Sequence, residues 1–89
     1  MNTDNWFVYI VECRDGSFYT GIAKNVEKRI AQHNAGTGAK YTKGRGPVTE
    51  VYRECLVNRS VASRREYAIK QMTKRQKYAL LHTTGPKNL

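Results

Sequence analysis

A predicted β-hairpin near the N-terminus constrains the fold of this chain more than any other feature. Residues 6–13 are rich in β-branched and aromatic side chains, and residues 17–22 return with the same character. The dipeptide Asp15-Gly16 between them is typical of a tight turn. The chain therefore predicts an antiparallel hairpin with one tyrosine in the middle of each strand, Tyr9 in the first and Tyr19 in the second.

The register of this hairpin decides whether the two tyrosines share a face of the sheet. A two-residue turn would pair Arg14 with Ser17 and place the tyrosines on opposite faces. A three-residue turn with Gly16 in the left-handed region would pair Cys13 with Ser17 and place both tyrosines on one face. We predict the three-residue turn because it separates the apolar residues better, leaving on the other face Val8, Ile10, Phe18 and Ile22.

The remainder of the chain predicts one more strand and three helices. Each helix start is marked by a residue type that caps helix N-termini. Apolar residues at helical spacing mark a buried stripe on the first two helices. The expected elements are a helix from the cap Asn25 to about Asn34, a strand over 48–56, a helix from Asn58 or Ser60 to Gln71 or Met72, and a helix from a capping box at Thr73 to about Leu81.

The order of these elements, β-β-α-β-α-α, predicts an α+β fold in which a small three-stranded antiparallel sheet is flanked by helices. With 89 residues, the chain is expected to form one domain over residues 1–82, followed by a flexible tail at 83–89. The segment 36–47 is a glycine-rich basic loop that is long for so small a domain, and such loops are often functional.

The distribution of charge indicates a polyanionic partner. The formal net charge is +9, and residues 36–89 hold twelve basic and three acidic side chains, so the whole surplus lies there. A basic field attracts polyanions and releases their counterions on binding. Nucleic acid is therefore the leading partner, with merely solvated lysines as the alternative. No predicted helix has the long apolar face that lying on a membrane requires.

Cysteine usage and the N-terminal residues indicate a cytoplasmic protein. Cys13 and Cys55 are isolated and have no neighbours at metal-ligand spacing, which is typical of reduced thiols. Residues 1–7 do not show the basic and then apolar pattern of a signal peptide. No apolar run approaches the roughly 18 residues of a membrane span.

Three polar side chains outside the hairpin are candidates for chemistry. Arg29 and His33 are four residues apart, so they lie on one face of the first predicted helix. Glu66 is the only acidic residue after Glu54. Considered singly, each has a simple structural explanation: a solvated arginine, a half-buried histidine, and for Glu66 an ion pair with Lys70 at the favourable spacing of four residues.

Considered together, these residues resemble the GIY-YIG nuclease superfamily. Val8-Tyr9-Ile10 is followed ten residues later by Tyr19-Thr20-Gly21, and then in order by Arg29, His33 and Glu66. The resemblance extends from about Trp6 to Leu81 and is closest to the small stand-alone bacterial members. It implies the three-stranded α+β fold already predicted, and a metal-dependent endonuclease that hydrolyses phosphodiester bonds in DNA, in repair or processing.

The resemblance also implies a role for each matching residue. Glu66 would hold a single divalent ion, Mg²⁺ or Mn²⁺, and Arg29 would bind the phosphate. Tyr19 or Tyr9 would be the general base while the other tyrosine positions water or phosphate, and His33 would assist proton transfer. A tyrosine has an ordinary pKa of about 10. To act as a base near neutral pH it needs positive charge nearby, which Arg29, Lys24 or the metal would supply.

Contacts with nucleic acid are expected mainly from the glycine-rich loop. Cations on this loop would follow a phosphate backbone, and its tyrosine would stack on a base. The expected contact residues are Lys24, Lys40, Tyr41, Lys43 and Arg45. DNA is favoured over RNA as the partner.

Some positions depart from the family pattern. Val8 and Thr20 replace a glycine and an isoleucine of the name motif. Ile22 stands where some members carry lysine, and Tyr78 stands near where some use an asparagine. The alternative function is therefore a nucleic-acid-binding module that keeps the fold with little or no catalysis. A third hypothesis is a subunit that contributes this domain to a larger repair complex.

Overall fold

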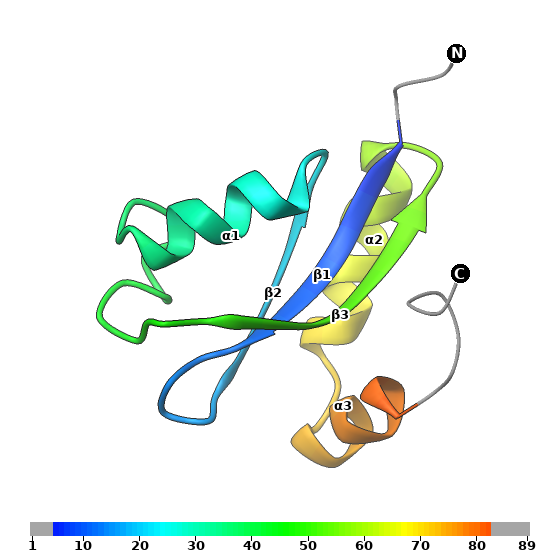
Figure 1. Ribbon diagram of the computed structural model, residues 1–89. Helices are drawn as coiled ribbons and strands as arrows, with labels where there is room; N and C mark the ends of the chain where they lie inside the picture. Colours follow the sequence, from blue (N-terminus) through cyan, green and yellow to red (C-terminus); the bar gives the residue numbers. More distant parts are fainter. Residues whose placement is uncertain (1–4, 83–89) are drawn as a thin grey trace.

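The six elements follow one another in the predicted order. The structure, a computed structural model, describes residues 5–82, so the tail expected at 83–89 lies outside the described residues. The sheet is antiparallel with strand order β2-β1-β3, which confirms the predicted α+β fold (Figure 1). The elements are β1 (Trp6–Glu12), β2 (Phe18–Ala23), α1 (Val26–Asn34), β3 (Thr49–Leu56), α2 (Arg59–Lys70) and α3 (Lys74–Leu81).

The hairpin of β1 and β2 has the three-residue turn. The Cys13 N–H donates to the Ser17 carbonyl at 2.8 Å, and Gly16 has a φ of +85°. A glycine adopts that left-handed conformation without the strain that a Cβ would bring. Tyr19 is paired with Val11, and Tyr9 with Gly21, so the two tyrosines lie on one face of the sheet. The predicted register is confirmed.

The helices begin at the predicted caps. The side chains of Asn25 and Asn58 accept hydrogen bonds from the first turns of α1 and α2, so Asn58 rather than Ser60 caps α2. Thr73 and Gln76 form the predicted capping box at the start of α3. These local contacts satisfy N–H groups that a helix N-terminus otherwise leaves without a partner.

Two separate cores cover the two faces of the sheet. On the side called here the α2 face, Val8 and Ile10 of β1 pack with Ala62 and Ile69 of α2. Phe18 and Ile22 join this cluster, which confirms the predicted core face. The other side, called here the α1 face, is covered by α1 and packs a second cluster, composed of Tyr9, Val11, Cys13, Ala23, Val26 and Val48.

A β-bulge in β3 changes which face its residues meet. Tyr52 is paired with Ile10, whereas Glu50 is paired with Val11, so one extra residue stands in β3 at this point. Because the extra residue inverts the alternation, Val48 packs on the α1 face while Tyr52 packs on the α2 face.

The edge strand β2 is where the two layers of helices meet. Both α1 and α2 pack against β2. Since no strand of residues 5–82 lies beyond it, side chains from the two faces can approach one another around this edge. Within residues 5–82 no helix is long and apolar enough to cross a membrane.

Candidate active site

Tyr9 lies buried on the α1 face, and Gly21 makes its position possible. The Tyr9 side chain is almost fully buried, and its hydroxyl lies 2.8 Å from His33 Nε2. A Cβ placed on Gly21 would lie 2.6 Å from the Tyr9 hydroxyl oxygen, closer than such atoms can approach. Glycine at this position therefore lets the Tyr9 ring lie across β2 toward the sheet edge.

Tyr19 lies beside Tyr9 but is partly exposed. The two ring centroids are 6.5 Å apart, and the Tyr19 ring also meets the His33 ring edge-on at 5.2 Å. On its other side Tyr19 stacks on Tyr41 of the glycine-rich loop, with centroids 5.8 Å apart and planes inclined by 22°. The two phenols thus share a face, as predicted, but only Tyr19 is open to a ligand.

His33 is buried between α1 and the glycine-rich loop. Its Nδ1 lies 2.8 Å from Thr42 Oγ1, and the Ala39 N–H approaches the same nitrogen at 3.3 Å. A Cβ on Gly38 would lie 2.8 Å from the His33 Cα, so the loop packs closely on the helix here. Burial, and then the positive charge of Arg29, lowers the pKa of His33 below its ordinary 6.5. The imidazole is therefore neutral at neutral pH.

Arg29 lies beside the Tyr9 hydroxyl. Burial and the Tyr19 phenol raise the pKa of Tyr9 to about 12, against the lowering effect of a hydrogen bond from Arg29 and of its charge. The Arg29 guanidinium also donates to Gln32 Oε1 at 2.9 Å. Of the two residues that the sequence placed on one face of α1, His33 contacts the Tyr9 phenol directly and Arg29 lies within electrostatic range of it.

Glu66 comes to this edge of the sheet from α2. Its charge is one of the smaller influences that raise the pKa of Tyr9, so it lies within electrostatic range of that phenol. The carboxylate forms an ion pair with Lys70 at 3.2 Å, as the simple structural explanation predicted. The Glu66 side chain is 22% exposed, so it is only partly buried.

The residues present fit a divalent ion shared with a substrate. Among residues 5–82, no three or more His, Cys, Asp or Glu side chains gather to hold a metal. Mg²⁺ characteristically keeps several waters and takes one or two carboxylates together with substrate phosphates. The single carboxylate of Glu66 fits that pattern and does not fit an ion held by protein ligands alone.

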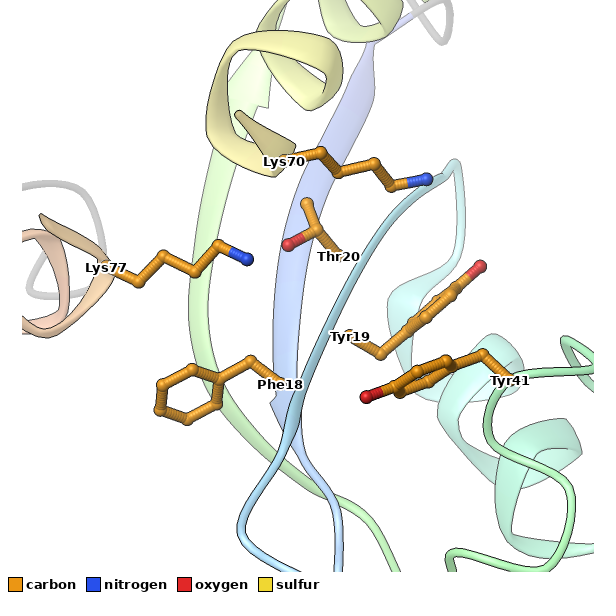
Figure 2. A pocket seen from close by; sticks show the side chains of 6 residues that line it. All are labelled: Phe18, Tyr19, Thr20, Tyr41, Lys70 and Lys77. Carbon is orange, nitrogen blue, oxygen red and sulfur yellow. The ribbon is translucent and has the colours of Figure 1, made fainter. Parts of the chain in front are cut away.

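A basic, aromatic cavity adjoins Tyr19. It has a volume of about 330 Å³ and is lined by Phe18, Tyr19, Thr20, Tyr41, Lys70 and Lys77. Figure 2 shows the stacked rings of Tyr19 and Tyr41 on one side and Phe18 on the other. Lys77 extends from α3 toward the space between them, and Lys70 extends from α2 past Thr20 to the Tyr19 side. Aromatic faces and ammonium groups are the groups that bind bases and phosphates.

The other residues predicted to contact nucleic acid differ in their exposure and in the contacts that they already make. Lys24, Lys40 and Lys43 are exposed. Arg45 is paired with Asp15 of the hairpin turn at 2.6 Å, and its guanidinium carbon lies 4.4 Å from the centroid of the Tyr41 ring. Arg45 therefore holds the loop against the hairpin.

Sequence reasoning missed three residues of this region. In the sequence Lys70 shows only the spacing of a partner of Glu66, and no pattern marks Lys77. Thr42 is 99% buried against His33, although a threonine in a polar loop gives no sign of burial in the sequence. Tyr78, which stands near a position where some family members use asparagine, packs edge-on against Phe18 with centroids 5.5 Å apart.

Comparison with known proteins identifies close relatives. The family model described as the GIY-YIG catalytic domain matches residues 5–79. The UPF0213 protein VNG_2274C of Halobacterium salinarum is 55% identical over 73 residues, which cover 82% of this chain and 95% of that protein. The UPF0213 protein SH2523 of Staphylococcus haemolyticus is 56% identical over 75 residues, which cover 84% of this chain and 92% of that protein.

A solved structure shows the same fold in a relative. The solution structure of the UPF0213 protein BH0048 from Bacillus halodurans superposes with a TM-score of 0.59 at 44% identity. The match covers 93% of this chain and 89% of that one.

Proposed function

This chain belongs to the GIY-YIG family, and from that membership we propose that it is a metal-dependent endonuclease that hydrolyses phosphodiester bonds in nucleic acid. DNA is the proposed substrate, in repair or processing. One observation supports the proposal above all: the two tyrosines, Arg29, His33 and Glu66 gather at the β2 edge beside a basic cavity. Of these residues Tyr19 lines the cavity itself, and Glu66 is joined to it through the ion pair with Lys70, another of its lining residues.

Within this proposal, the exposure of the two phenols divides their roles. Tyr19 is the phenol that can reach a substrate, so it accepts the proton of the attacking water as the new oxygen–phosphorus bond forms and the bond from phosphorus to the leaving oxygen breaks. The Lys70 ammonium lies 5.8 Å from the centroid of the Tyr19 ring. Tyr9, buried behind it, holds Arg29, whose fork fits a phosphate and stabilises the charge that grows on its oxygens.

Glu66 is the proposed metal ligand, for one Mg²⁺ or Mn²⁺. When bound, such an ion would polarise the phosphodiester and neutralise charge on the leaving oxygen. To hold the ion, Glu66 would exchange its contact with Lys70, and the Lys70 ammonium would then be available to a substrate phosphate. The basic surface along which a nucleic-acid strand would lie is extended by Lys77 on the far side of the cavity and by Lys40 and Lys43 on the loop.

The second candidate function is a nucleic-acid-binding module with this fold and little or no catalysis. The Glu66–Lys70 ion pair favours it, because it gives the carboxylate a structural role that needs no metal. A contribution to a larger repair complex remains a third proposal. We also propose a cytoplasmic location, since buried Cys13 and exposed Cys55 are both free thiols, as is usual in a reducing compartment.

Plasmid nicking separates the first two candidates. Supercoiled DNA is incubated with the protein in Mg²⁺, in Mn²⁺ and in EDTA, beside the variants Glu66→Gln and Tyr19→Phe. Each variant has a matched control that changes the same residue type at an exposed position away from the cavity, Glu12→Gln and Tyr67→Phe. We expect nicking that requires metal, with a loss of about 100-fold in Tyr19→Phe, a typical contribution of a general base.

The outcomes are distinct. Nicking lost in both site variants and kept in both controls supports the nuclease. Gel shifts that weaken with salt, without cleavage in either metal, contradict it and support the binding module.

A further inference from the structure

Four polar groups form a buried chain that begins at Tyr9 and ends in the glycine-rich loop. The Tyr9 hydroxyl lies 2.8 Å from His33 Nε2, and His33 Nδ1 lies 2.8 Å from Thr42 Oγ1. Thr42 Oγ1 in turn lies 2.9 Å from the Ala39 carbonyl oxygen. The Tyr9, His33 and Thr42 residues are each 1% exposed, so these groups must share their protons with one another rather than with solvent.

The end of the chain fixes the direction of every bond in it. A carbonyl oxygen can only accept, so Thr42 gives its single hydroxyl proton to Ala39. Thr42 Oγ1 must then accept from His33 Nδ1, which carries the ring proton. In a neutral imidazole the other nitrogen is an acceptor, so Nε2 accepts the proton of the Tyr9 hydroxyl.

Each tautomer satisfies three of the four contacts, but the opposite one gains the longest of them and loses one of the shorter ones at 2.8–2.9 Å. An unprotonated Nδ1 could accept a hydrogen bond from the Ala39 N–H. That nitrogen lies 3.3 Å from Nδ1, which is the longest of the four hydrogen-bond distances and at the outer end of the usual range. An unprotonated Nδ1 has one lone pair, and it would then face both that N–H and the oxygen of Thr42. Either Thr42 would abandon the Ala39 carbonyl, or two lone pairs would face each other at 2.8 Å.

The direction of the chain matters at its other end, where Arg29 lies. Because Tyr9 gives its only proton to His33, its oxygen presents lone pairs to the site. A guanidinium has donors alone and cannot be deprotonated in proteins, so it requires such an acceptor. Arg29 is the group that acts to lower the pKa of Tyr9, which is the effect expected of a cationic donor near an accepting oxygen. In the opposite tautomer the Tyr9 proton would point toward the site and compete with Arg29.

We propose that Thr42 is a positioning residue of the active site: by accepting the Nδ1 proton it fixes the tautomer of His33, and thereby makes the Tyr9 oxygen an acceptor that holds Arg29. The tautomer is a property of the folded protein alone. Its consequence for phosphate binding and cleavage rests on the proposed nuclease function.

The tautomer is measured by long-range ¹H–¹⁵N NMR correlations of the histidine rings, on protein labelled with ¹⁵N and at a pH above 7. The chain has two histidines, and His82→Gln assigns the signals of His33. We expect the wild-type Nδ1 to resonate as a protonated nitrogen and Nε2 as an unprotonated one. Thr42→Ser keeps the hydroxyl and should keep this pattern, whereas Thr42→Val should shift the population toward the Nε2-protonated form.

Thr20→Val is the matched control, because Thr20 is an equally buried threonine that lies on the other face of β2, and it should leave the His33 signals unchanged. A wild-type His33 protonated at Nε2 overturns the proposal. So does a folded Thr42→Val protein with the wild-type pattern. If Thr42→Val does not fold, the wild-type and Thr42→Ser spectra still decide the tautomer.

The nicking assay then tests the consequence. We expect kcat to fall at least 10-fold in Thr42→Val and to recover in Thr42→Ser, a rescue that loss of packing alone would not give. Activity unchanged in a Thr42→Val protein whose tautomer has shifted overturns the positioning role. If the wild-type protein cleaves nothing in any metal, the proposed function fails, and the NMR result on the tautomer is unaffected.

Discussion

The two faces of the sheet are built from the same strands in opposite ways. On the α2 face, apolar side chains such as Val8 and Ile69 are completely buried against one another. On the α1 face, the equally buried centre holds the polar chain of Tyr9, His33 and Thr42. Alternation along β1 sends neighbouring residues to these two environments. Both faces bury apolar side chains, but the α1 face also keeps polar groups in one arrangement by giving each a partner.

The buried polar groups of the α1 face are all satisfied. Within residues 5–82 no buried side-chain nitrogen or oxygen is without a hydrogen-bond partner. A buried polar group is costly only when its partner is removed. The comparison therefore predicts two kinds of destabilisation. On the α2 face the free energy of unfolding should fall most when a buried apolar side chain is truncated, and on the α1 face when a buried polar group loses its hydrogen-bond partner.

The largest effect on stability is expected from Ile69→Ala on the α2 face. Ile69 is fully buried, and the truncation leaves a cavity that should cost about 2–5 kcal/mol of unfolding free energy. Ile30→Ala, on the α1 face, removes the same atoms from a partly buried position and should cost less. Urea denaturation of both variants measures the difference. Equal losses would show that the two faces carry similar shares of apolar stability.

Gly21→Ala should disrupt the packing of the α1 face although it removes no side-chain group. The new methyl would lie 2.6 Å from the Tyr9 hydroxyl oxygen and 3.1 Å from the Tyr19 ring, so both phenols must move. We expect a loss of about 3 kcal/mol, in the upper part of the range for overpacked sites, and a displaced His33 signal in NMR spectra. Gly46→Ala is the control, because a methyl there meets its nearest atom at 3.7 Å. Similar stability in both variants would contradict the close approach.

Tyr9→Phe and Tyr52→Phe compare one lost hydroxyl on each face. Tyr9→Phe leaves His33 Nε2 buried without a partner and should cost about 1–3 kcal/mol. Tyr52 donates to Glu54 at 2.7 Å, but Glu54 keeps its hydrogen bonds from Arg65, so Tyr52→Phe should cost only about 0.5–1.5 kcal/mol. Chemical denaturation measures both. A larger loss for Tyr52→Phe would contradict the contrast between the faces.

The smallest effect is a dependence of stability on pH. Burial lowers the pKa of His33, so the unfolded chain binds a proton more readily than the folded one. The stabilisation is complete above the ordinary pKa of 6.5 and is lost as pH falls through the lower pKa of the folded state. Carboxylates whose pKa is lowered in the folded state, such as Glu54, change the stability only when the pH falls below about 4.5. Denaturation midpoints between pH 7.5 and 5 should therefore decline in the wild type and in His82→Gln, and change less in His33→Gln.

The fold was largely predictable because its determinants are local. The turn at Gly16 and the caps Asn25, Asn58 and Thr73 each act within about three residues of themselves. The alternation of apolar side chains then chose the hairpin register, which placed both tyrosines on one face. The bulge in β3 was not predicted, since it depends on pairing with β1 across a long separation in sequence.

The site was predictable only in part. The pattern of tyrosines with Arg29 and His33 identified residues that the structure does bring together. The burial of Tyr9 was not foreseen, because it depends on the space that Gly21 leaves. The burial of Thr42 depends on how an irregular loop folds back onto α1, and no periodicity in the sequence describes such a path.

The attachment of the glycine-rich loop at two points has a consequence for binding. Arg45 joins it to the hairpin turn through Asp15, and Thr42 joins it to α1 through His33. A loop that moved freely would lose conformational entropy when a bound nucleic-acid strand immobilised it, and that loss would weaken the complex. Here the ordering occurs during folding, so Tyr41 already stands beside Tyr19 before any strand arrives. The basic surface is therefore preorganised, and the association with nucleic acid should proceed close to rigid-body docking.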